Sequence, residues 1–177
     1  AAVRFYYPDG GYFTNSVVQN SGYTGFEAYS STLTVTHNSF LDCTYDGVYS
    51  SASNLNLDNC IFNGNGHAGV SAQGGELQIS NSQFNSNGYY AAYLSGVNVK
   101  SYSGNTGSNN TINAFGISGT INQNLTLSQA GCGFPFVLNG STTLAAGYTL
   151  TIPAGEVIKS LNGDLHINGT LNAIGTN

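Results

Sequence analysis

Carboxylates and histidines are the side chains of this chain that could support catalysis or bind a metal. Glycoside hydrolysis needs two carboxylates across a cleft, roughly 5–10 Å apart. Asp42 and Asp46 are close in sequence and could face one groove, but acids near a turn more often face solvent or cap the turn. His37, His67 and His166 are scattered, and no Cys-x-x-Cys pair occurs, so zinc-ligand spacing is absent. The sequence therefore predicts a protein that is not an enzyme, with no metal site and no cofactor.

Tyrosines are the candidate ligand-binding side chains. Exposed aromatic rings can stack on sugars or on a neighbouring subunit. The alternative, which we favour, is that they pack across strands on a β surface. The candidates are Tyr45, Tyr49, Tyr89, Tyr90 and Tyr93.

Few residues of this chain are charged, and this limits the kinds of partner that it can bind. Charged residues make up 6% of the 177 residues, and the net charge is −5 with only Arg4, Lys100 and Lys159 as basic side chains. Nucleic acids and anionic membrane surfaces need clustered Lys and Arg, so neither is an expected partner. No apolar run approaches the ~18 residues that would insert into a bilayer. Neutral polar residues must cover the surface, which favours an extracellular or cell-surface protein that packs against copies of itself or against glycans.

A repeat of 22 residues dominates the first two thirds of the chain. Units that begin at Thr32, Asn54 and Glu76 align without gaps. The aligned apolar sets are Leu33, Leu55 and Leu77; Val35, Leu57 and Ile79; Phe40, Phe62 and Phe84; and Val48, Val70 and Ala92. Within each unit apolar and polar residues alternate, which is the period of a β-strand. Each unit is therefore one coil of about three short strands, and successive coils stack in parallel ~4.8 Å apart.

The repeat extends backwards and decays forwards. Phe13 falls at the Val35 position of the preceding unit. After about residue 100, the same spacing places Ser101 at the Ile79 position and Thr106 at the Phe84 position. The period predicts about 22 residues per rung and roughly eight rungs in an all-β solenoid.

Two polar sets also repeat, and we expect both to form asparagine ladders at corners of the coil, because stacked Asn side chains hydrogen-bond from rung to rung. They are His37, Asn59 and Asn81, and Cys43, Asn65 and Asn87. The same register places Cys60 on an inward position and Cys43 on a corner, so we expect no bridge between them. With Cys132 the cysteines are odd in number, and their pairing stays open.

Stretches such as LDNCIFNGNGHAGV and ISNSQFNSNGYYAAYL carry a resemblance to a known repeat. They are similar to the right-handed parallel β-helix repeat of pectate-lyase-like proteins and of many secreted bacterial surface proteins, over roughly residues 11–117. The resemblance implies a right-handed parallel β-helix. It says little about function, since this scaffold hosts lyases, hydrolases, adhesins and structural proteins.

The rhythm changes near residue 120, so we divide the chain into rungs at 1–119 and a continuing solenoid segment at 120–177. Alternation predicts strands at 149–152, 156–159, 164–167 and 170–173. The second segment resembles the start of a further β-helix module, and the first residues resemble a stretch inside such a module. The two ends therefore suggest a permuted module that stacks end to end with copies of itself.

Three functions remain open. The first is a non-enzymatic extracellular structural module that stacks head to tail into a filament, surface layer or matrix. The alternatives are a glycan-binding or adhesin segment that uses the tyrosines, and a non-catalytic fragment of a larger polysaccharide-degrading enzyme. Four Asn-x-Ser/Thr triplets are possible N-glycosylation sites in a secreted protein: Asn109, Asn124, Asn139 and Asn168.

Overall fold

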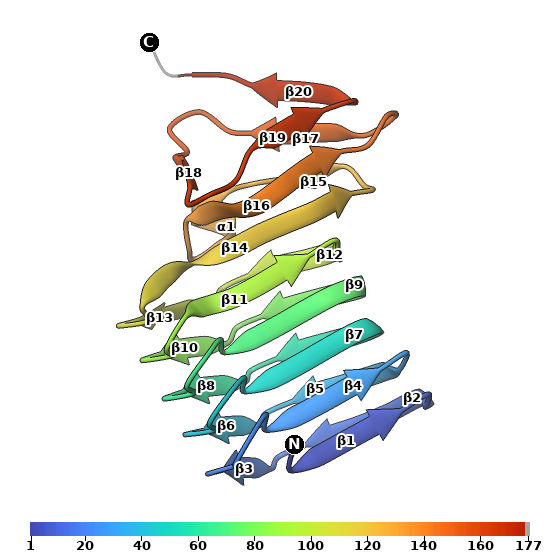
Figure 1. The fold of residues 1–177 in the computed structure, drawn as a ribbon, viewed down its shortest axis with the longest axis vertical. Helices are drawn as coiled ribbons and strands as arrows, with labels where there is room; N and C mark the ends of the chain where they lie inside the picture. The colour runs from blue at the N-terminus through green and yellow to red at the C-terminus, as the bar shows by residue number, and fades with distance from the viewer. Residues whose placement is uncertain (176–177) are drawn as a thin grey trace.

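The chain winds into a parallel β-solenoid of about eight turns. The computed structural model describes residues 1–175, and Figure 1 shows the rungs stacked upright from β1 to β20. Every strand pairing in the stack is parallel, as expected when successive rungs repeat the same coil. This confirms the predicted fold class.

Three rows of strands form the walls, and each rung contributes one strand to each row. The first row holds β1 (Val3–Tyr6), β4 (Phe26–Tyr29), β7 (Val48–Asp58), β9 (Val70–Ser80), β11 (Tyr90–Ser95), β14 (Ile112–Ile121), β16 (Phe136–Leu144) and β18 (Ile158–Ser160). The second row holds β2 (Asp9–Thr14), β5 (Thr32–Thr36), the later halves of β7, β9, β14 and β16, and also β12 (Asn98–Ser103) and β19 (Leu165–Ile167). Because β7 and β9 each continue around the corner, the first two rows are joined into one sheet.

The third row changes its strands partway up the stack. Lower rungs supply β3 (Val17–Gln19), β6 (Ser39–Leu41), β8 (Ile61–Asn63), β10 (Gln83–Asn85) and β13 (Thr106–Ser108). Upper rungs supply a separate sheet of β15 (Leu125–Thr126), β17 (Thr149–Ile152) and β20 (Thr170–Ala173). The short helix α1 (Gln129–Cys132) lies in the same upper part.

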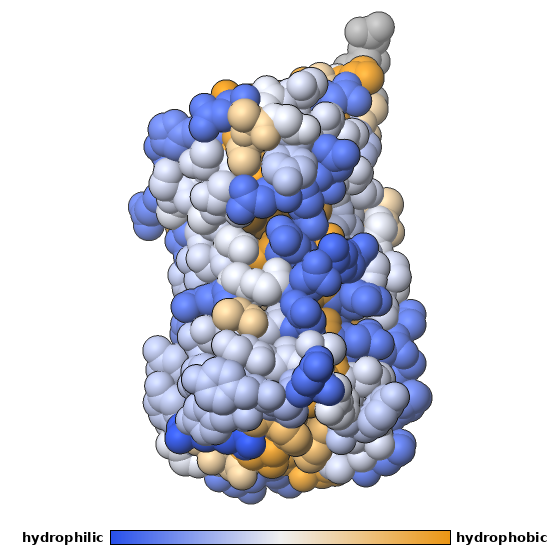
Figure 2. Space-filling model, turned by 90° about the vertical axis from the view of Figure 1, so that its right-hand side faces the viewer, coloured by the Kyte–Doolittle hydropathy of each residue, from blue (hydrophilic) through white to orange (hydrophobic). Residues whose placement is uncertain are grey.

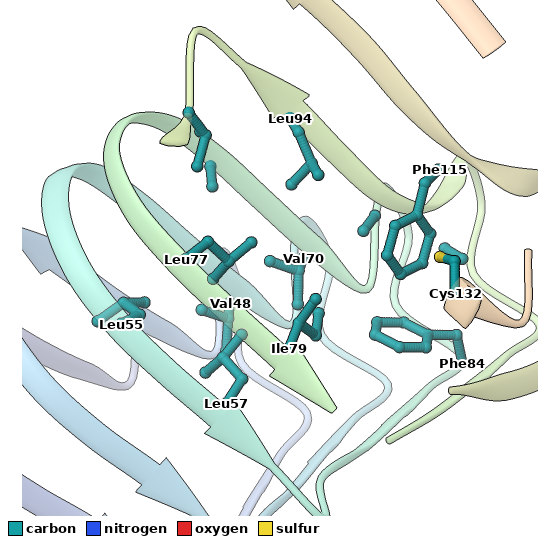
Figure 3. Close-up of a cluster of buried hydrophobic side chains, with 14 of the residues drawn as sticks. Val48, Leu55, Leu57, Val70, Leu77, Ile79, Phe84, Leu94, Phe115 and Cys132 are labelled. Atoms are coloured by element: carbon teal, nitrogen blue, oxygen red, sulfur yellow. The ribbon is translucent and has the colours of Figure 1, made fainter. Parts of the chain in front are cut away.

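The predicted 22-residue register is confirmed through the regular rungs. Leu55 pairs with Leu33 below it and with Leu77 above it. In the third row, Phe62 pairs with Phe40 below it and with Phe84 above it. These side chains fill the interior, where Val48 and Val70 on one wall lie opposite Leu57 and Ile79 on the next (Figure 3). Stacking of rungs thus buries a continuous apolar core that a single rung could not bury.

The register predicted beyond residue 100 is wrong by one residue. Val99 pairs with Leu77, but Ser101 pairs with Gln78 and Tyr102 takes the position above Ile79. The extra residue is Lys100, a β-bulge that makes this rung 23 residues long. A one-residue slip turns each following side chain to the other face of the strand, so Tyr102 packs against the core in place of Ser101. Likewise Gly107, and not Thr106, pairs with Phe84.

One of the two predicted asparagine ladders is present. Asn65 Nδ2 donates to Asn87 Oδ1 at 3.0 Å, and Asn87 Nδ2 donates to Asn110 Oδ1 at 2.8 Å, all three side chains being buried. At the foot of the column the Cys43 amide donates to Asn65 Oδ1 at 3.2 Å. The ladder therefore satisfies buried amides that the corner leaves unpaired.

The other predicted ladder is wrong. His37, Asn59 and Asn81 are exposed and lie at φ of +57°, +52° and +50°. Asn adopts this left-handed backbone readily, so their role is to turn the chain. The buried residue that follows each of them makes the rung-to-rung bonds instead. That second buried ladder is Asn38, Cys60, Ser82 and Asn105, for example with the Ser82 amide donating to Asn105 Oδ1 at 3.1 Å.

Gly47 stands at a corner where successive rungs approach closely. A Cβ there would lie 2.7 Å from the Gly69 carbonyl oxygen and 2.9 Å from Asn65 Nδ2 in the ladder. Glycine at this position therefore lets the coil close beneath the asparagine column.

The upper part of the stack differs from the sequence expectation in two elements. The Gly-rich stretch near Cys132 forms α1, whose N-cap Ser128 accepts a bond from the Gly131 amide and whose C-cap Gly133 has φ of +92°. The strand expected at 156–159 is β18 at Ile158–Ser160, while the strands expected at 149–152 and 170–173 are found. Across residues 119 and 120 the strand β14 runs on and pairs with β16, so the solenoid continues without a break.

All three cysteines are buried free thiols. Cys43 and Cys60 lie in different columns, as the register predicts. Burial raises the pKa of the Cys60 thiol to about 11 and that of Cys132 to about 12. Among residues 1–175, no helix has the length and apolar character needed to span a bilayer.

Candidate functional site

An open groove of about 630 Å³ runs along the solenoid axis on one face of the stack. Its lining residues, which define it here, are Gly10, Gly11, Tyr12, Thr32, Leu33, Thr34, Asn54, Leu55, Asn56, Glu76, Leu77, Gln78 and Lys100. They come from β2, β5, the later halves of β7 and β9, and β12. The groove therefore crosses five successive rungs.

Strand alternation explains the row of polar side chains in this groove. In β5 the side chains of Leu33 and Val35 are buried, so Thr32 and Thr34 face outwards. Parallel register then stacks Thr34, Asn56 and Gln78 into one outward row. Hydroxyl and amide groups both donate and accept hydrogen bonds, so the row offers uncharged partners of both kinds at every rung.

The two ends of the groove carry different chemistry. At the lower end Tyr12 is 82% exposed. At the upper end Lys100 Nζ lies 2.7 Å from Glu76 Oε1, and both side chains are partly exposed. Lys100 is the extra residue of the bulge, so the break in the repeat is also what places a cation at the end of the groove.

A column of stacked aromatic side chains lies at another corner of the same rungs. Tyr23 stacks on Tyr45 with ring centroids 5.2 Å apart, and His67 lies 4.9 Å above Tyr45. Tyr89 follows 4.9 Å above His67. Their spacing in sequence is the 22 residues of the repeat, so this column is a direct product of the register.

Beside this column lies a small pocket of about 230 Å³, called here the tyrosine pocket. Its lining residues are Tyr23, Thr24, Glu27, Tyr29, Tyr45, Asp46 and Tyr49. Both carboxylates are 2% exposed as residues. The pocket thus combines aromatic walls with two buried acids, and no Lys, Arg or His lines it.

Hydrogen bonds hold Asp46 by one of its oxygens. Oδ1 accepts bonds from His67 Nδ1 at 2.7 Å, from the Ala68 amide at 3.1 Å and from Ser71 Oγ at 2.8 Å. Because an ionised carboxylate only accepts, Nδ1 of the imidazole carries the proton of this bond. Oδ2 receives none of these bonds.

Glu27 is held in the same way by the neighbouring rung. Arg4 pairs with Glu27 in the strand register, and its Nε bonds to Glu27 Oε2. The Tyr29 hydroxyl donates to the same oxygen at 3.3 Å. The contact with Glu27 raises the pKa of Arg4, while burial and then the nearby Glu27 charge raise the pKa of Tyr29.

Comparison with protein families agrees with this geometry. The model of the right-handed β-helix region matches residues 1–143. The chain belongs to the right-handed β-helix family. No significant match was found among curated proteins or among solved structures. The match establishes the right hand and the superfamily of the solenoid. The function of this β-helix protein has to be inferred from the residues on its surface.

The five predicted tyrosines fall into two groups on the β-helix. Tyr45 and Tyr49 line the tyrosine pocket. Tyr89 and Tyr93 pack around Tyr90 with Ala114 and Val137 in a separate apolar cluster higher up. Tyr90 is fully buried, and burial raises its pKa to about 12. Tyr90 therefore offers no exposed ring to a ligand, because the 22-residue register places it above Ala68, which is also fully buried.

Sequence reasoning named one of the two pocket acids, Asp46, and missed the other, Glu27. It paired Asp42 with Asp46, but Asp42 is an exposed turn residue at φ +51° that does not line the pocket. The partner of Asp46 in the pocket is Glu27, from a different part of the preceding rung. The available signal was the 22-residue spacing itself, which places Glu27 beneath Tyr49 and Tyr23 beneath Tyr45.

The remaining predicted positions lie on the surface. Asn109, Asn124 and Asn168 are exposed, whereas Asn139 is half-buried and donates from Nδ2 to the Tyr89 hydroxyl at 2.7 Å. Within residues 1–175 no group of three or more His, Cys, Asp or Glu side chains is placed to hold a metal ion.

Proposed function

We propose that this β-helix is an extracellular, non-catalytic module that binds a neutral polysaccharide chain lengthwise in the groove. The observation that carries the proposal is the groove itself, about 630 Å³ in volume and lined at successive rungs by Thr, Asn and Gln. An extended sugar chain presents a repeating set of hydroxyl groups, and a stack of identical rungs presents a repeating set of amides and hydroxyls to meet them. Tyr12 adds an exposed ring for stacking on a sugar face.

Binding without cleavage is supported by the acids of the groove. Glu76 is the one carboxylate among its lining residues, and Lys100 already pairs with it. Hydrolysis of a glycosidic bond uses two carboxylates on opposite sides of the bond. A polysaccharide bound here would therefore be held and not cut.

Substitution of the outward row tests the proposal. Asn56→Ala with Gln78→Ala removes two amides from the groove, and Ser39→Ala with Gln83→Ala removes two polar groups from the outer surface of β6 and β10. We expect soluble β-glucan, xylan or galactomannan to retard the wild-type chain in affinity electrophoresis. The groove variant should lose that retardation and the control variant should keep it. No retardation by any neutral polysaccharide, or equal retardation of both variants, would overturn the proposal.

A second function, end-to-end stacking, is favoured by the first and last described rungs. In the first rung the inward side chains of Val3, Phe5 and Phe13 are only partly buried, and in the last rung Leu171 and Ile174 are 44% and 66% exposed. Figure 2 shows hydrophobic residues gathered at the lower end of the molecule, where the first rung lies. Such rungs also present unpaired strand edges, which another rung can extend. We propose that a further β-helix rung, from an adjoining segment or from a second copy, covers each end.

Sedimentation velocity on the 177-residue chain separates these possibilities. Head-to-tail pairing between copies should give species that grow with concentration, because such contacts do not close. A second sample carrying Leu171→Lys, at the inward position above Leu150, should stay monomeric. A wild-type chain that stays monomeric up to its solubility limit would contradict stacking between copies.

A further inference from the structure

We propose that the tyrosine pocket is a second binding site, specific for a primary ammonium group such as that of an amino sugar or a lysine side chain. The inference goes beyond the groove, since the two sites share no lining residue. It rests on the charge of the pocket, on the unused oxygens of its acids, and on its size.

The charge of the pocket favours a cation. Glu27 and Asp46 bring two carboxylates, each 2% exposed as a residue, into one pocket. Arg4 offsets one of these charges from outside the pocket. His67 Nδ1 bonds to Asp46 Oδ1 from outside the pocket lining, and an imidazole in its neutral form leaves the charge of the carboxylate in place. A buried carboxylate without a compensating cation is costly, so a ligand that supplies one gains that energy on binding.

The geometry of the acids favours a cation that carries N–H groups. The bonds to Asp46 converge on Oδ1, and those to Glu27 converge on Oε2. Asp46 Oδ2 and Glu27 Oε1 are the acceptors that remain for a ligand. An ammonium group has three donors and no acceptor, which matches a pocket whose unused polar atoms are acceptors.

The aromatic walls argue against a quaternary ammonium ligand. Recognition of that group uses the faces of aromatic rings. Tyr45 lies between Tyr23 and His67, so both of its faces are occupied by stacking. One face of Tyr29 is covered by Tyr6, at 5.0 Å and 10°. The rings therefore confine the carbon stem of a ligand, while the carboxylates bind its nitrogen.

The pocket is also small. Its volume of about 230 Å³ lies below the range of roughly 300–1,000 Å³ that holds drug-sized ligands. One sugar ring or one lysine side chain is the size of group that it can take.

Titration of the wild-type chain with charged and acetylated pairs tests the proposal directly. The sugar arm uses glucosamine against N-acetylglucosamine, and the peptide arm uses Nα-acetyl-lysine methylamide against its Nε-acetylated form. Acetylation removes the charge in both arms and leaves the rest of the probe unchanged. We expect amide NMR shifts around Tyr45 and Tyr49 with the charged probe of at least one arm, and at least about tenfold weaker binding of its acetylated partner. The arm that binds more tightly identifies the source of the ammonium group.

A matched pair of charge variants locates the site. Asp46→Asn keeps an acceptor for the bonds that Oδ1 now makes and replaces Oδ2 with a donor, so it should weaken binding of the charged probe at least about tenfold. Asp164→Asn changes the net charge equally at an exposed position outside both sites and should leave this binding unchanged. Equal binding of charged and acetylated probes, no binding of either charged probe, or unchanged binding by folded Asp46→Asn would overturn the proposal. The comparison of probes needs no variant, so it decides the matter even if Asp46→Asn fails to fold.

Discussion

Two regions of the solenoid share the same three-strand coil but differ in the regularity of their register. They are the regular rungs between Thr32 and Val97 and the rungs from Asn98 upwards. In the regular rungs the spacing is 22 residues throughout, and every column of side chains is continuous. Above them, bulges and shifts make the spacing vary, as when Ala92 pairs with Phe115 and Phe115 with Phe136. Both proposed binding surfaces are built mainly from the regular rungs and those just below them.

This difference shows what a strict period does in a solenoid. A constant register repeats the same outward group at each rung, which creates the polar row of the groove and the aromatic column beside the pocket. The same register repeats inward groups, which creates the ladders. One extra residue, Lys100, shifts the register and ends the groove.

Removing a core side chain from a regular rung should have the largest effect on stability. Phe62 is fully buried between Phe40 and Phe84, with ring centroids 5.4 and 4.8 Å away. Phe62→Ala should lower the free energy of unfolding by about 3–5 kcal/mol, since it leaves a cavity between two rungs. Leu171→Ala in β20, where the side chain is 44% exposed, should cost less than about 1 kcal/mol. Urea unfolding followed by circular dichroism measures both, and similar losses would show that the regular rungs have no better-packed core.

Breaking the ladder should come next. Asn87→Ala removes the acceptor of both the Asn65 amide and Asn65 Nδ2, and leaves the Phe62 carbonyl without its donor. We expect a loss of about 2–4 kcal/mol, because each orphaned buried group costs roughly 1–3 kcal/mol. Asn63→Ala, a partly exposed position on β8, should change stability by less than about 0.5 kcal/mol. Equal effects in the same urea assay would mean that the ladder does not stabilise the stack.

Acid titration distinguishes the two regions through one aspartate in each. Hydrogen bonds from Ser80 foremost, and from Asn81 and Asn59, lower the pKa of Asp58. Its contribution to stability is therefore complete above the ordinary carboxyl pKa of about 3.9, and is lost as the pH falls through the lower value of the folded state. Asp58→Asn should flatten this acid limb of the stability curve.

Asp164 in the upper rungs provides the contrast. A hydrogen bond from Ser141 and the nearby His166 lower its pKa as well, but the side chain is 62% exposed and solvent screens the pair. Asp164→Asn should flatten the acid limb less than Asp58→Asn does. Thermal unfolding between pH 2 and pH 6 (roughly the range that spans these carboxyl groups) measures both, and a larger change for Asp164→Asn would reverse the comparison.

The ion pair at the end of the groove should contribute least to stability. Glu76 and Lys100 are 42% and 48% exposed as side chains. Glu76→Gln should therefore change the free energy of unfolding by no more than about 1 kcal/mol in urea unfolding. A larger loss would mean that the pair anchors the bulge and does more than border the groove.

The sequence was sufficient for the fold wherever the period held. Alignment of Leu33, Leu55 and Leu77 predicted strand, register and buried face together, because each residue fixes its neighbour one rung away. The position of the bulge at Lys100 was not predictable from that alignment, since the gain from burying Tyr102 depends on the packing around it. The pocket was hidden for a related reason. Glu27 and Asp46 lie in different columns, and only the folding of the corner brings them to one cavity.

Mapping a bound oligosaccharide on the backbone amides tests whether the groove binds sugar. Hexasaccharides of the neutral polysaccharides that bind in electrophoresis would be titrated into the ¹⁵N-labelled chain. We expect shift changes confined to the groove, in β5 and in the later halves of β7 and β9, ending near Lys100. Changes centred on β6, β8 and β10 or on the rungs above Asn98, or no changes at saturating sugar, would contradict binding in the groove.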